Sequence, residues 1–429
     1  MSKRWRVLGI ALVAAAILPV ASRPAQPKIL AQWVEFGPDG NSSARAITDE
    51  ACPSVTFDGV ATPMRVRSEP GQKFGNVKAA QFAVRGCEIA IPAGAVTGLI
   101  DGKPLPLPRL NPQRIVMFGD TGCRLKTGDP TQACNEPKAW PYPQVAAMAA
   151  AARPDLVIHV GDYEYREEAC PAGNAGCAGS SYGYGWDAWN ADFFAPSAPL
   201  LAAAPWIMVR GNHEDCDRAG EGWFRFLDPS LMEPACRDLT GDYVVRLGDF
   251  GVVVVDSAKV KDNVGIDGDQ VPILRRQFID VLGKIPDQAW LATHKPVNGM
   301  LAMPGNRDAN IVANKVLQVA LGADMPASVK MYVAGHIHFF QAIEFGAARP
   351  PQLVVGTGGD NLEGMPKAAV AGADINGLRA LAAVTYSGFA YMVWDRAGSN
   401  NVWNGTLFDV DGKPLNRCRL ADRSLSCGS

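Results

Sequence analysis

The stretch that decides the fold is Leu156-Val157-Ile158-His159-Val160, followed directly by Gly161-Asp162-Tyr163-Glu164-Tyr165. The apolar run has the length and composition of a buried parallel strand, and the glycine marks its end. Asp162 therefore follows the carboxyl end of a strand, where open α/β sheets build their sites. By itself the segment also fits a structural turn closed by an aspartate, so its function depends on the rest of the chain.

From Arg114 onward, apolar strands alternate with helical patterns. Strands are predicted at 115–118, 156–160, 206–209, 251–256, 290–293 and 331–334, and helices at 144–152, 186–194 and 271–282. This alternation is typical of an α/β domain with a mainly parallel sheet and crossover helices. The segment 167–197 is rich in Gly, Tyr and Trp and interrupts this order. A loop of that length is usually functional.

The chain on either side of this region is rich in β patterns. Residues 28–108 contain short alternating segments separated by Gly and Pro clusters, which predict a small antiparallel β-sandwich-like domain. The proline-rich piece 103–108 is typical of a stiff linker, so we place a catalytic domain at 112–429. Within it, residues 345–429 are β-rich and either complete a sheet of the same domain or form a β cap.

The N-terminus and the cysteines both indicate export. Basic residues precede the apolar run 7–21, which ends in Val20-Ala21-Ser22, so residues 1–22 are predicted to be a signal peptide. A short membrane-anchored helix is the alternative; no membrane span is expected after cleavage. The ten cysteines form an even number, which favours disulfides in a secreted or periplasmic protein. Neighbours along the chain are the candidate pairs: Cys52/Cys87, Cys123/Cys134, Cys170/Cys177, Cys216/Cys236 and Cys418/Cys427.

The five histidines are placed unusually. Four of them lie just beyond predicted strands, beside Gly, Asn or Pro, and two strand-end aspartates accompany them: His213, His294, His336, His338, Asp120 and Asp162. A single histidine is most often a hydrogen-bonded core residue, but that explanation does not account for four at strand ends. His159 lies inside the apolar strand, and we assign it a structural or supporting place. The net charge of −2 gives no indication of a nucleic-acid-binding surface.

These residues divide into two unequal sets of metal ligands. Asp120, Asp162 and Tyr165 with one imidazole offer three anionic oxygens, whereas Asn212 with two imidazoles offers no anion unless Asp162 bridges. Hard anionic oxygens favour a more highly charged ion. We therefore predict Fe(III) in the first set and a divalent ion in the second, with a residual positive charge suited to a phosphate ester.

Five short blocks resemble the calcineurin-like metallophosphoesterases and occur in that family's order. They are Asp120-Thr121-Gly122, Gly161-Asp162-Tyr163-Glu164-Tyr165, Gly211-Asn212-His213-Glu214, His294, and Gly335-His336-Ile337-His338. The combination of Asp-x-Gly with Gly-Asp-x-x-Tyr resembles specifically the purple acid phosphatase branch. Most other members have Asp-x-His at the first block. Here Gly122 replaces that histidine, and the resemblance implies that Tyr165 takes the vacated coordination position.

The resemblance implies a four-layer α-β-β-α sandwich preceded by the small N-terminal β domain. By matching motif positions, Asp120, Tyr165 and His338 would hold Fe(III), and Asn212, His294 and His336 the divalent ion (zinc, manganese or iron), with Asp162 bridging. His213 would contact the phosphate and protonate the leaving oxygen, and Glu214 would orient His213 or share its proton. The implied reaction is in-line attack of a metal-bound hydroxide on a small-molecule phosphate monoester.

One departure bears on the substrate. Family phosphatases often carry further substrate-binding histidines after the block that matches His294, and this chain has none between 295 and 335. Asn298, Arg307 and Asn310 are the candidates to substitute. The alternatives are a phosphodiesterase for nucleotide or glycerol-type diesters and a weakly catalytic metal-binding surface protein. The natural substrate, the divalent ion and the oligomeric state do not follow from the sequence.

Overall fold

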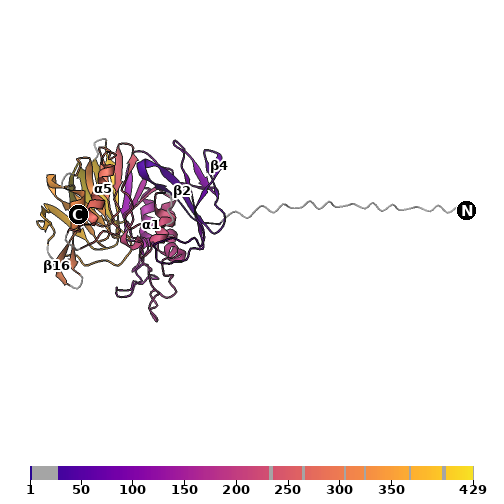
Figure 1. Ribbon diagram of the computed structural model, residues 1–429, viewed down its shortest axis with the longest axis horizontal. Coiled ribbons are helices and arrows are strands. Elements are labelled where there is room, and N and C mark those ends of the chain that lie inside the picture. The colour runs from indigo at the N-terminus through magenta and orange to yellow at the C-terminus, as the bar shows by residue number, and fades with distance from the viewer. Residues whose placement is uncertain are drawn as a thin grey trace.

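A computed structural model describes residue 1 and residues 28–230, 235–262, 266–303, 306–322, 325–366, 369–398 and 402–428, without the side chains of 303–313 (Figure 1). The predicted signal peptide lies outside these residues except for Met1. No helix in the described ranges is long and apolar enough to cross a membrane.

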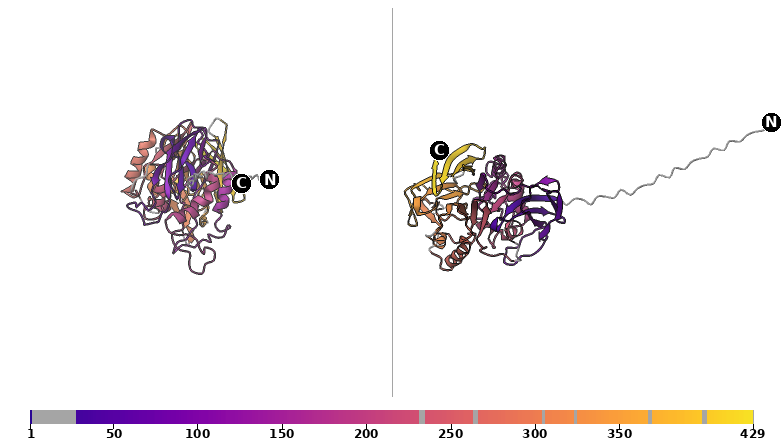
Figure 2. Two further views of the ribbon diagram at one scale, coloured as in Figure 1. Left: turned by 90° about the vertical axis from the view of Figure 1, so that its right-hand side faces the viewer. Right: turned by 90° about the horizontal axis from the view of Figure 1, so that it is seen from above.

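The first large sheet has parallel strands at its centre and antiparallel strands on both sides. Its eleven strands follow in the order β26 (Ser424–Gly428), β25 (Pro414–Ala421), β24 (Val402–Asp409), β23 (Ala390–Ala397), β9 (Arg114–Phe118), β10 (Leu156–His159), β11 (Trp206–Met208), β1 (Ile29–Phe36), β2 (Ser42–Thr48), β6 (Arg85–Ala90) and β5 (Arg65–Ser68). The N-terminal and C-terminal strands therefore lie at opposite ends of the molecule (Figure 2).

The second large sheet contains the later strands of the α/β region. Its order is β12 (Tyr243–Leu247), β13 (Phe250–Val254), β14 (Ala289–Ala292), β17 (Val329–Ala334), β19 (Gln352–Val355), β18 (Phe340–Glu344) and β22 (Ala382–Tyr386). β13, β14, β17 and β19 pair in parallel. Small sheets complete the described strands: β4 (Val60–Pro63), β3 (Ser54–Phe57), β7 (Gly98–Ile100) and β8 (Lys103–Pro104); β15 (Gly299–Met303) with β16 (Asn306–Ala313); β20 (Asp374–Ile375) with β21 (Leu378–Arg379).

The two large sheets pack face to face, and helices cover their outer faces. In β10, Leu156 and Ile158 point into the core between the sheets, whereas Val157 points into the core under the helices of the first sheet. Those helices are α1 (Tyr142–Ala151), α2 (Trp186–Trp189), which continues through 190–194, and α3 (Ala195–Leu201). Helices α5 (Gln270–Leu282) and α6 (Lys315–Leu321) cover the second sheet. The predicted α-β-β-α sandwich is confirmed.

Local chemistry explains where the helices begin. α1 begins after Pro141, carries Pro143 in its first turn, where the missing N–H costs nothing, and continues mainly on alanine. α6 has an asparagine cap, because the side chain of Asn314 accepts a hydrogen bond from Leu317 N at 3.2 Å. The sequence patterns did not predict this helix. Among the alternating segments within 28–108, residues 80–84 do not form a strand.

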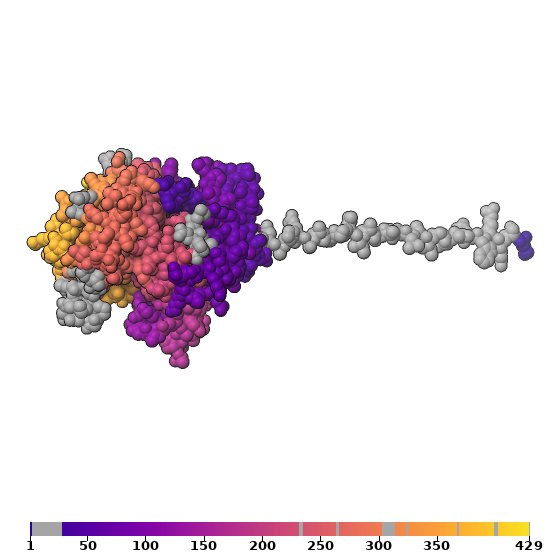
Figure 3. All heavy atoms as spheres, viewed as in Figure 1, coloured from indigo at the N-terminus to yellow at the C-terminus, as the bar shows by residue number. Residues whose placement is uncertain are grey.

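The N-terminal β region is joined to the α/β region that follows it by a shared sheet. β1 pairs in parallel with β11, and β2, β6 and β5 continue the sheet outward. The boundary predicted at 108–112 stays a prediction, but the first sheet runs across it. Figure 3 shows the N-terminal region (indigo) in direct contact with the chain that follows. The C-terminal strands are divided, since β22 extends the second sheet and β23–β26 the first. They therefore complete the sandwich.

All ten cysteines are paired as sequence neighbours. The disulfides join Cys52 to Cys87, Cys123 to Cys134, Cys170 to Cys177, Cys216 to Cys236 and Cys418 to Cys427. The second, third and fourth of these lie in loops that follow strands β9, β10 and β11, and they fasten that edge of the sheet.

Candidate metal centre

Two neighbouring parallel strands deliver the first two carboxylates. β9 and β10 pair as far as Phe118 and His159, and Asp120 and Asp162 follow after short glycine-containing turns. The backbones of the turns are joined, because Asp120 N donates to Gly161 O at 2.9 Å and Thr121 N donates to Asp162 O at 3.0 Å. The two aspartates therefore meet at one edge of the sheet, as the strand-end argument predicts.

The second sheet delivers the histidines to the same place. β14 is followed by His294 and β17 by Gly335-His336-Ile337-His338, and Gly335 N donates to His294 O at 3.0 Å. Contacts between the sheets join these histidines to the turns after β9 and β10. His336 N donates to Asp120 Oδ2 at 3.0 Å, and His294 Nδ1 lies 2.8 Å from Val160 O. Four strand ends from two sheets thus converge.

Three of these residues have a backbone conformation that residues other than glycine rarely adopt. Asp120, Asp162 and His336 have φ values of 58°, 60° and 68°. Non-glycine residues with positive φ cost free energy and concentrate at functional sites. The strain falls on the residues that turn polar side chains toward one another, which supports a functional rather than a merely structural turn at Asp162.

The phenol of Tyr165 lies at the centre of the first predicted ligand set. It donates to Asp162 Oδ2 at 2.7 Å, lies 3.2 Å from Asp120 Oδ1, and lies 3.2 Å from His338 Nε2. His338 Nε2 is itself 3.2 Å from Asp120 Oδ1. Burial, and then the charges of Asp162 and Asp120, raise the pKa of Tyr165 well above its usual value. A cation among these atoms would compensate the buried carboxylates and favour the tyrosinate.

The second predicted set lies on the other side of Asp162. His294 Nε2 is 3.2 Å from Asp162 Oδ2 and 2.9 Å from Asn212 Oδ1. One ligand atom from each of Asp162, His294 and His336 lies within 4.8 Å of the others. The structure therefore brings all seven predicted ligands together, with Asp162 between the two groups. Their roles as ligands stay a prediction.

Gly122 leaves room for the tyrosine. A Cβ atom at this position would lie 2.7 Å from Tyr165 N and 2.8 Å from both Tyr165 Cδ2 and Asp192 Oδ2. Carbon atoms do not approach backbone and ring atoms so closely without displacement. A histidine at 122 and the observed placement of Tyr165 are therefore mutually exclusive.

The carboxylate of Glu214 supports the loop that carries Asp162. Its oxygens accept hydrogen bonds from Asp162 N at 3.1 Å, Tyr163 N at 2.8 Å, Glu164 N at 3.3 Å and Gly211 N at 3.1 Å. These four contacts do not fit the prediction that Glu214 orients His213. Glu214 instead satisfies the backbone amides of two turns that would otherwise be buried without acceptors.

His213 pairs with a different carboxylate, Glu167, which was not predicted as a site residue. His213 Nδ1 lies 3.1 Å from Glu167 Oε1, its ring packs 3.7 Å from that of Tyr165, and Nε2 lies 3.9 Å from Asp162 Oδ2. Arg218 pairs with Glu167 and lies 2.6 Å from His213 Nδ1. Burial, and then the charge of Arg218, lower the pKa of His213 to about 3. Glu167 opens the long segment 167–197, where a functional loop is predicted.

His159 has the supporting place expected for it. Its ring stacks on Tyr163 at 4.0 Å, Nε2 lies 3.1 Å from Thr121 Oγ1, and Nδ1 accepts from Gly161 N at 3.2 Å. Burial lowers the pKa of His159 well below its usual value, so that the ring is neutral. It connects the turn after β9 with the turn after β10.

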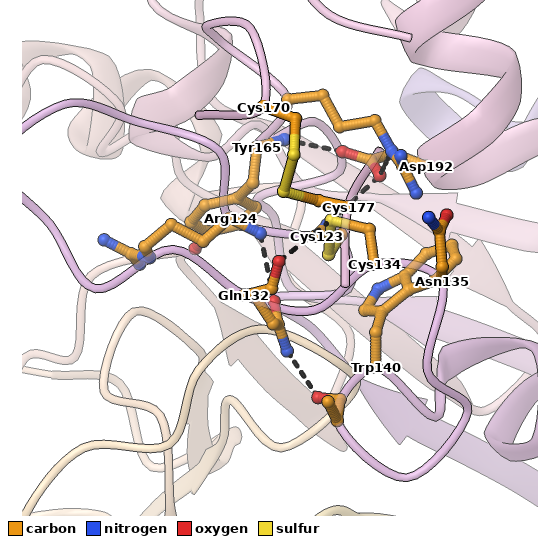
Figure 4. The surroundings of a disulfide bond; sticks show 12 residues. Cys123, Arg124, Gln132, Cys134, Asn135, Trp140, Tyr165, Cys170, Cys177 and Asp192 are labelled. Carbon is orange, nitrogen blue, oxygen red and sulfur yellow. Dashed lines mark hydrogen bonds and ion pairs between the residues drawn. A yellow bond between two sulfur atoms is a disulfide. The ribbon is translucent and has the colours of Figure 1, made fainter. Parts of the chain in front are cut away.

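Asp192 and two disulfides hold the other side of the Tyr165 loop (Figure 4). The buried Asp192 carboxylate accepts from Tyr165 N at 2.8 Å and Cys123 N at 3.1 Å. The Cys123–Cys134 and Cys170–Cys177 disulfides lie beside it, and Gln132 Oε1 accepts from Arg124 N at 3.0 Å. No sequence motif marks Asp192, which lies 27 residues beyond Tyr165. It joins the first and second motif blocks.

The candidates to replace the missing substrate histidines receive little support. Asn298 is buried and accepts from Gln318 Nε2 at 2.9 Å, so it faces α6. The side chains of Arg307 and Asn310 lie outside the described residues. Of these three candidates, only Asn298 is placed by the described side chains, and its contact with α6 gives no support for a substrate role; Arg307 and Asn310 stay predictions.

The whole arrangement of motif blocks corresponds to one known family, since residues 113–340 match the calcineurin-like phosphoesterases. The chain belongs to this family. As a calcineurin-like phosphoesterase, it has a fold that implies a divalent metal centre, and the N and O donors of Asp162, His294 and His336 fit such a centre. Family membership supports a metal-dependent phosphoesterase acting on a small-molecule substrate.

Two solved structures share this fold. The chain is similar to purple acid phosphatase PPD1 from yellow lupin (Lupinus luteus) seeds, with a TM-score of 0.60 and 13% identity over 94% of this chain and 74% of that one. It is also similar to PhoD, with a TM-score of 0.53 and 11% identity over 95% of this chain and 94% of that one. No curated protein sequence matches the chain significantly.

Proposed function

We propose that this calcineurin-like phosphoesterase is an exported phosphomonoesterase of the purple acid phosphatase type. Asp120, Tyr165 and His338 would hold Fe(III), and Asn212, His294 and His336 a divalent ion (zinc, manganese or iron), with Asp162 shared. Two such ions would lower the pKa of a coordinated water and neutralise charge on the phosphoryl oxygens. The support for this assignment is the convergence of donor atoms around Tyr165 and around His294.

The chain's own residues would position the substrate and move a proton. His213 Nε2 faces Asp162 Oδ2 at 3.9 Å, on the side where the phosphate would bind. Glu167, 3.1 Å from Nδ1, fixes the ring and stabilises its protonated form, as a carboxylate behind a catalytic histidine does. The negative charge of a phosphate ester also favours protonation of His213. His213 then donates its Nε2 proton to the departing alkoxide oxygen.

One observation supports the purple acid phosphatase branch over the rest of the family. The Tyr165 phenol contacts Asp120, Asp162 and His338, and no side chain fits at position 122 while Tyr165 lies there. The test is metal analysis and a visible spectrum of the purified protein. We expect iron in the protein and a tyrosinate-to-Fe(III) absorption band that is lost in Tyr165→Phe. Tyr184→Phe is the matched control, because Tyr184 OH donates to Glu167 Oε2 at 2.8 Å and is expected to leave the band intact. An active enzyme without iron or colour would refute the Fe(III) assignment.

The reaction is tested with a chromogenic phosphate monoester and its bis-ester. We expect a higher kcat/KM on the monoester. A preference for the bis-ester would instead make the protein a phosphodiesterase. No hydrolysis of either ester, or of a broad panel, by metal-loaded protein would favour the weakly catalytic metal-binding surface protein.

Export is proposed from the predicted signal peptide and is consistent with the five disulfides. The experiment is N-terminal sequencing of the protein recovered from the periplasm or medium. We expect the mature chain to begin after Ser22 or one residue to either side. Recovery of the uncleaved chain from the cytoplasm with free thiols would contradict export.

A further inference from the structure

The three candidate histidine ligands are anchored in two different ways. His294 Nδ1 lies 2.8 Å from the backbone carbonyl of Val160, and His338 Nδ1 lies 2.8 Å from that of Asn361. In both cases the other nitrogen, Nε2, faces the candidate ligands. His338 Nδ1 lies in addition 3.4 Å from Asp360 Oδ2. His336 differs in its orientation, because Nε2 is the nitrogen that faces a carboxylate, 3.3 Å from Asp262 Oδ2. Asp262 belongs to no motif block and has no place in the proposed reaction.

Asp262 is held firmly in this position. Lys295 Nζ lies 2.6 Å from its Oδ2, and Asn314 Nδ2 donates to its Oδ1 at 3.0 Å. Lys295 is buried and also donates to Val260 O at 2.6 Å. Lys295 directly follows His294, and Asn314 caps α6. The carboxylate is therefore fixed by two other elements of the fold rather than by the histidine.

We propose that Asp262 is a positioning residue for the divalent-ion site. It accepts the Nε2 proton of His336, which leaves Nδ1 unprotonated as the ligand atom of that ring. Histidine ligands commonly donate their second N–H to a carboxylate, which fixes the tautomer and makes the imidazole a stronger ligand. The inference rests on the proposed metal assignment and extends it to a residue outside the ligand set.

The charge of Asp262 gives this contact a second effect. Asn212, His294 and His336 are neutral ligands, so in the proposed centre the divalent ion shares Asp162 as its protein anion. A carboxylate one imidazole away supplies negative charge without occupying a coordination position. Lys295 offsets part of that charge while fixing its place. In the Fe(III) set, whose ligands already include two carboxylates and a phenol, His338 Nδ1 likewise lies 3.4 Å from a carboxylate oxygen, Asp360 Oδ2.

The test compares metal binding by wild type, Asp262→Asn and Asp267→Asn. Asp262→Asn keeps the size and one acceptor oxygen but removes the charge. Asp267 is a matched control, because it lies in the same loop and pairs with an exposed lysine, Lys261, at 2.8 Å. The readouts are zinc and iron content after dialysis against a chelator, the dissociation constant for Zn²⁺ by competition, and the visible spectrum.

We expect Asp262→Asn to bind Zn²⁺ about 10- to 100-fold more weakly, with iron content and the tyrosinate band unchanged. The retained band also shows that the variant is folded. Asp267→Asn is expected to match the wild type. Unchanged Zn²⁺ affinity in Asp262→Asn, while the wild type binds two metals, overturns this inference alone. A wild type that binds no second metal overturns the proposed function as well.

Discussion

Replacing Glu214 with glutamine tests whether this residue supports the Asp162 loop or serves His213. Its Oε1 accepts from Tyr163 N and Glu164 N, and its Oε2 from Asp162 N and Gly211 N. A glutamine presents one oxygen to one pair of amides and an NH₂ group to the other pair. Two buried backbone donors then lose their acceptor, at about 1–3 kcal/mol each. We therefore expect Glu214→Gln to lower the free energy of unfolding by about 2–6 kcal/mol.

The assay is urea-induced unfolding followed by tryptophan fluorescence, together with metal content. The displaced Asp162 backbone is expected to lower metal occupancy at the same time. Glu69→Gln is the control, since Glu69 is an exposed partner of Arg85 and its change is expected to stay within about 0.5 kcal/mol. If Glu214→Gln lost activity while stability and metal content stayed at wild-type levels, Glu214 would act on His213 and the structural role would be refuted.

Three further perturbations have defined outcomes. Glu167→Gln removes the charge behind His213, and we expect kcat to fall by about 10²-fold on alkyl phosphates but less on nitrophenyl phosphate, which needs no acid for its leaving group; an equal loss on both would contradict the acid role. Gly122→Ala places a Cβ 2.7 Å from Tyr165 N and is expected to weaken or shift the tyrosinate band, which an unchanged spectrum would disprove. Burial, despite the opposing charge of Arg45, raises the pKa of Glu35 from 4.5 to about 7. Between pH 4.5 and about 7, Glu35 therefore keeps its proton in the folded protein and loses it in the unfolded chain. Its stability relative to Glu35→Gln is greatest below pH 4.5 and falls by about 3 kcal/mol as the pH rises to about 7, measured by urea unfolding across that range; a difference independent of pH would refute this.

Local patterns were sufficient to predict an α/β domain with the candidate ligands at its strand ends, and the family resemblance added the four-layer sandwich. Asp120, Asp162 and the histidines follow buried strands, and parallel strands present their carboxyl ends at one edge of a sheet. The link between Gly122 and Tyr165 was implied by the family resemblance, and the structure gives its reason, because a Cβ at position 122 would collide with Tyr165.

The carboxylates that support the candidate ligands could not be predicted from the sequence. Glu167 and Asp262 lie in loops, and Asp192 lies in the helical segment 190–194. No motif marks any of the three, and each acts through a contact that depends on how distant parts of the chain fold together. Glu214 was assigned to its sequence neighbour His213, whereas the fold turns its carboxylate toward amides about fifty positions earlier. Proximity in sequence predicted the wrong partner, because a tight turn separates adjacent side chains.

The pairing of β1 with β11 has a consequence for the order of folding. Glu35 stands opposite Trp206, so the first strand of the described chain has its partner more than 150 residues later. During vectorial synthesis or translocation, β1 can form its hairpin with β2 but has no inner neighbour until β11 emerges. Contacts of such sequence separation form slowly and leave strand edges exposed meanwhile. The N-terminal region is therefore completed by the catalytic region, and a chain stopped before β11 would present an unpaired, aggregation-prone edge.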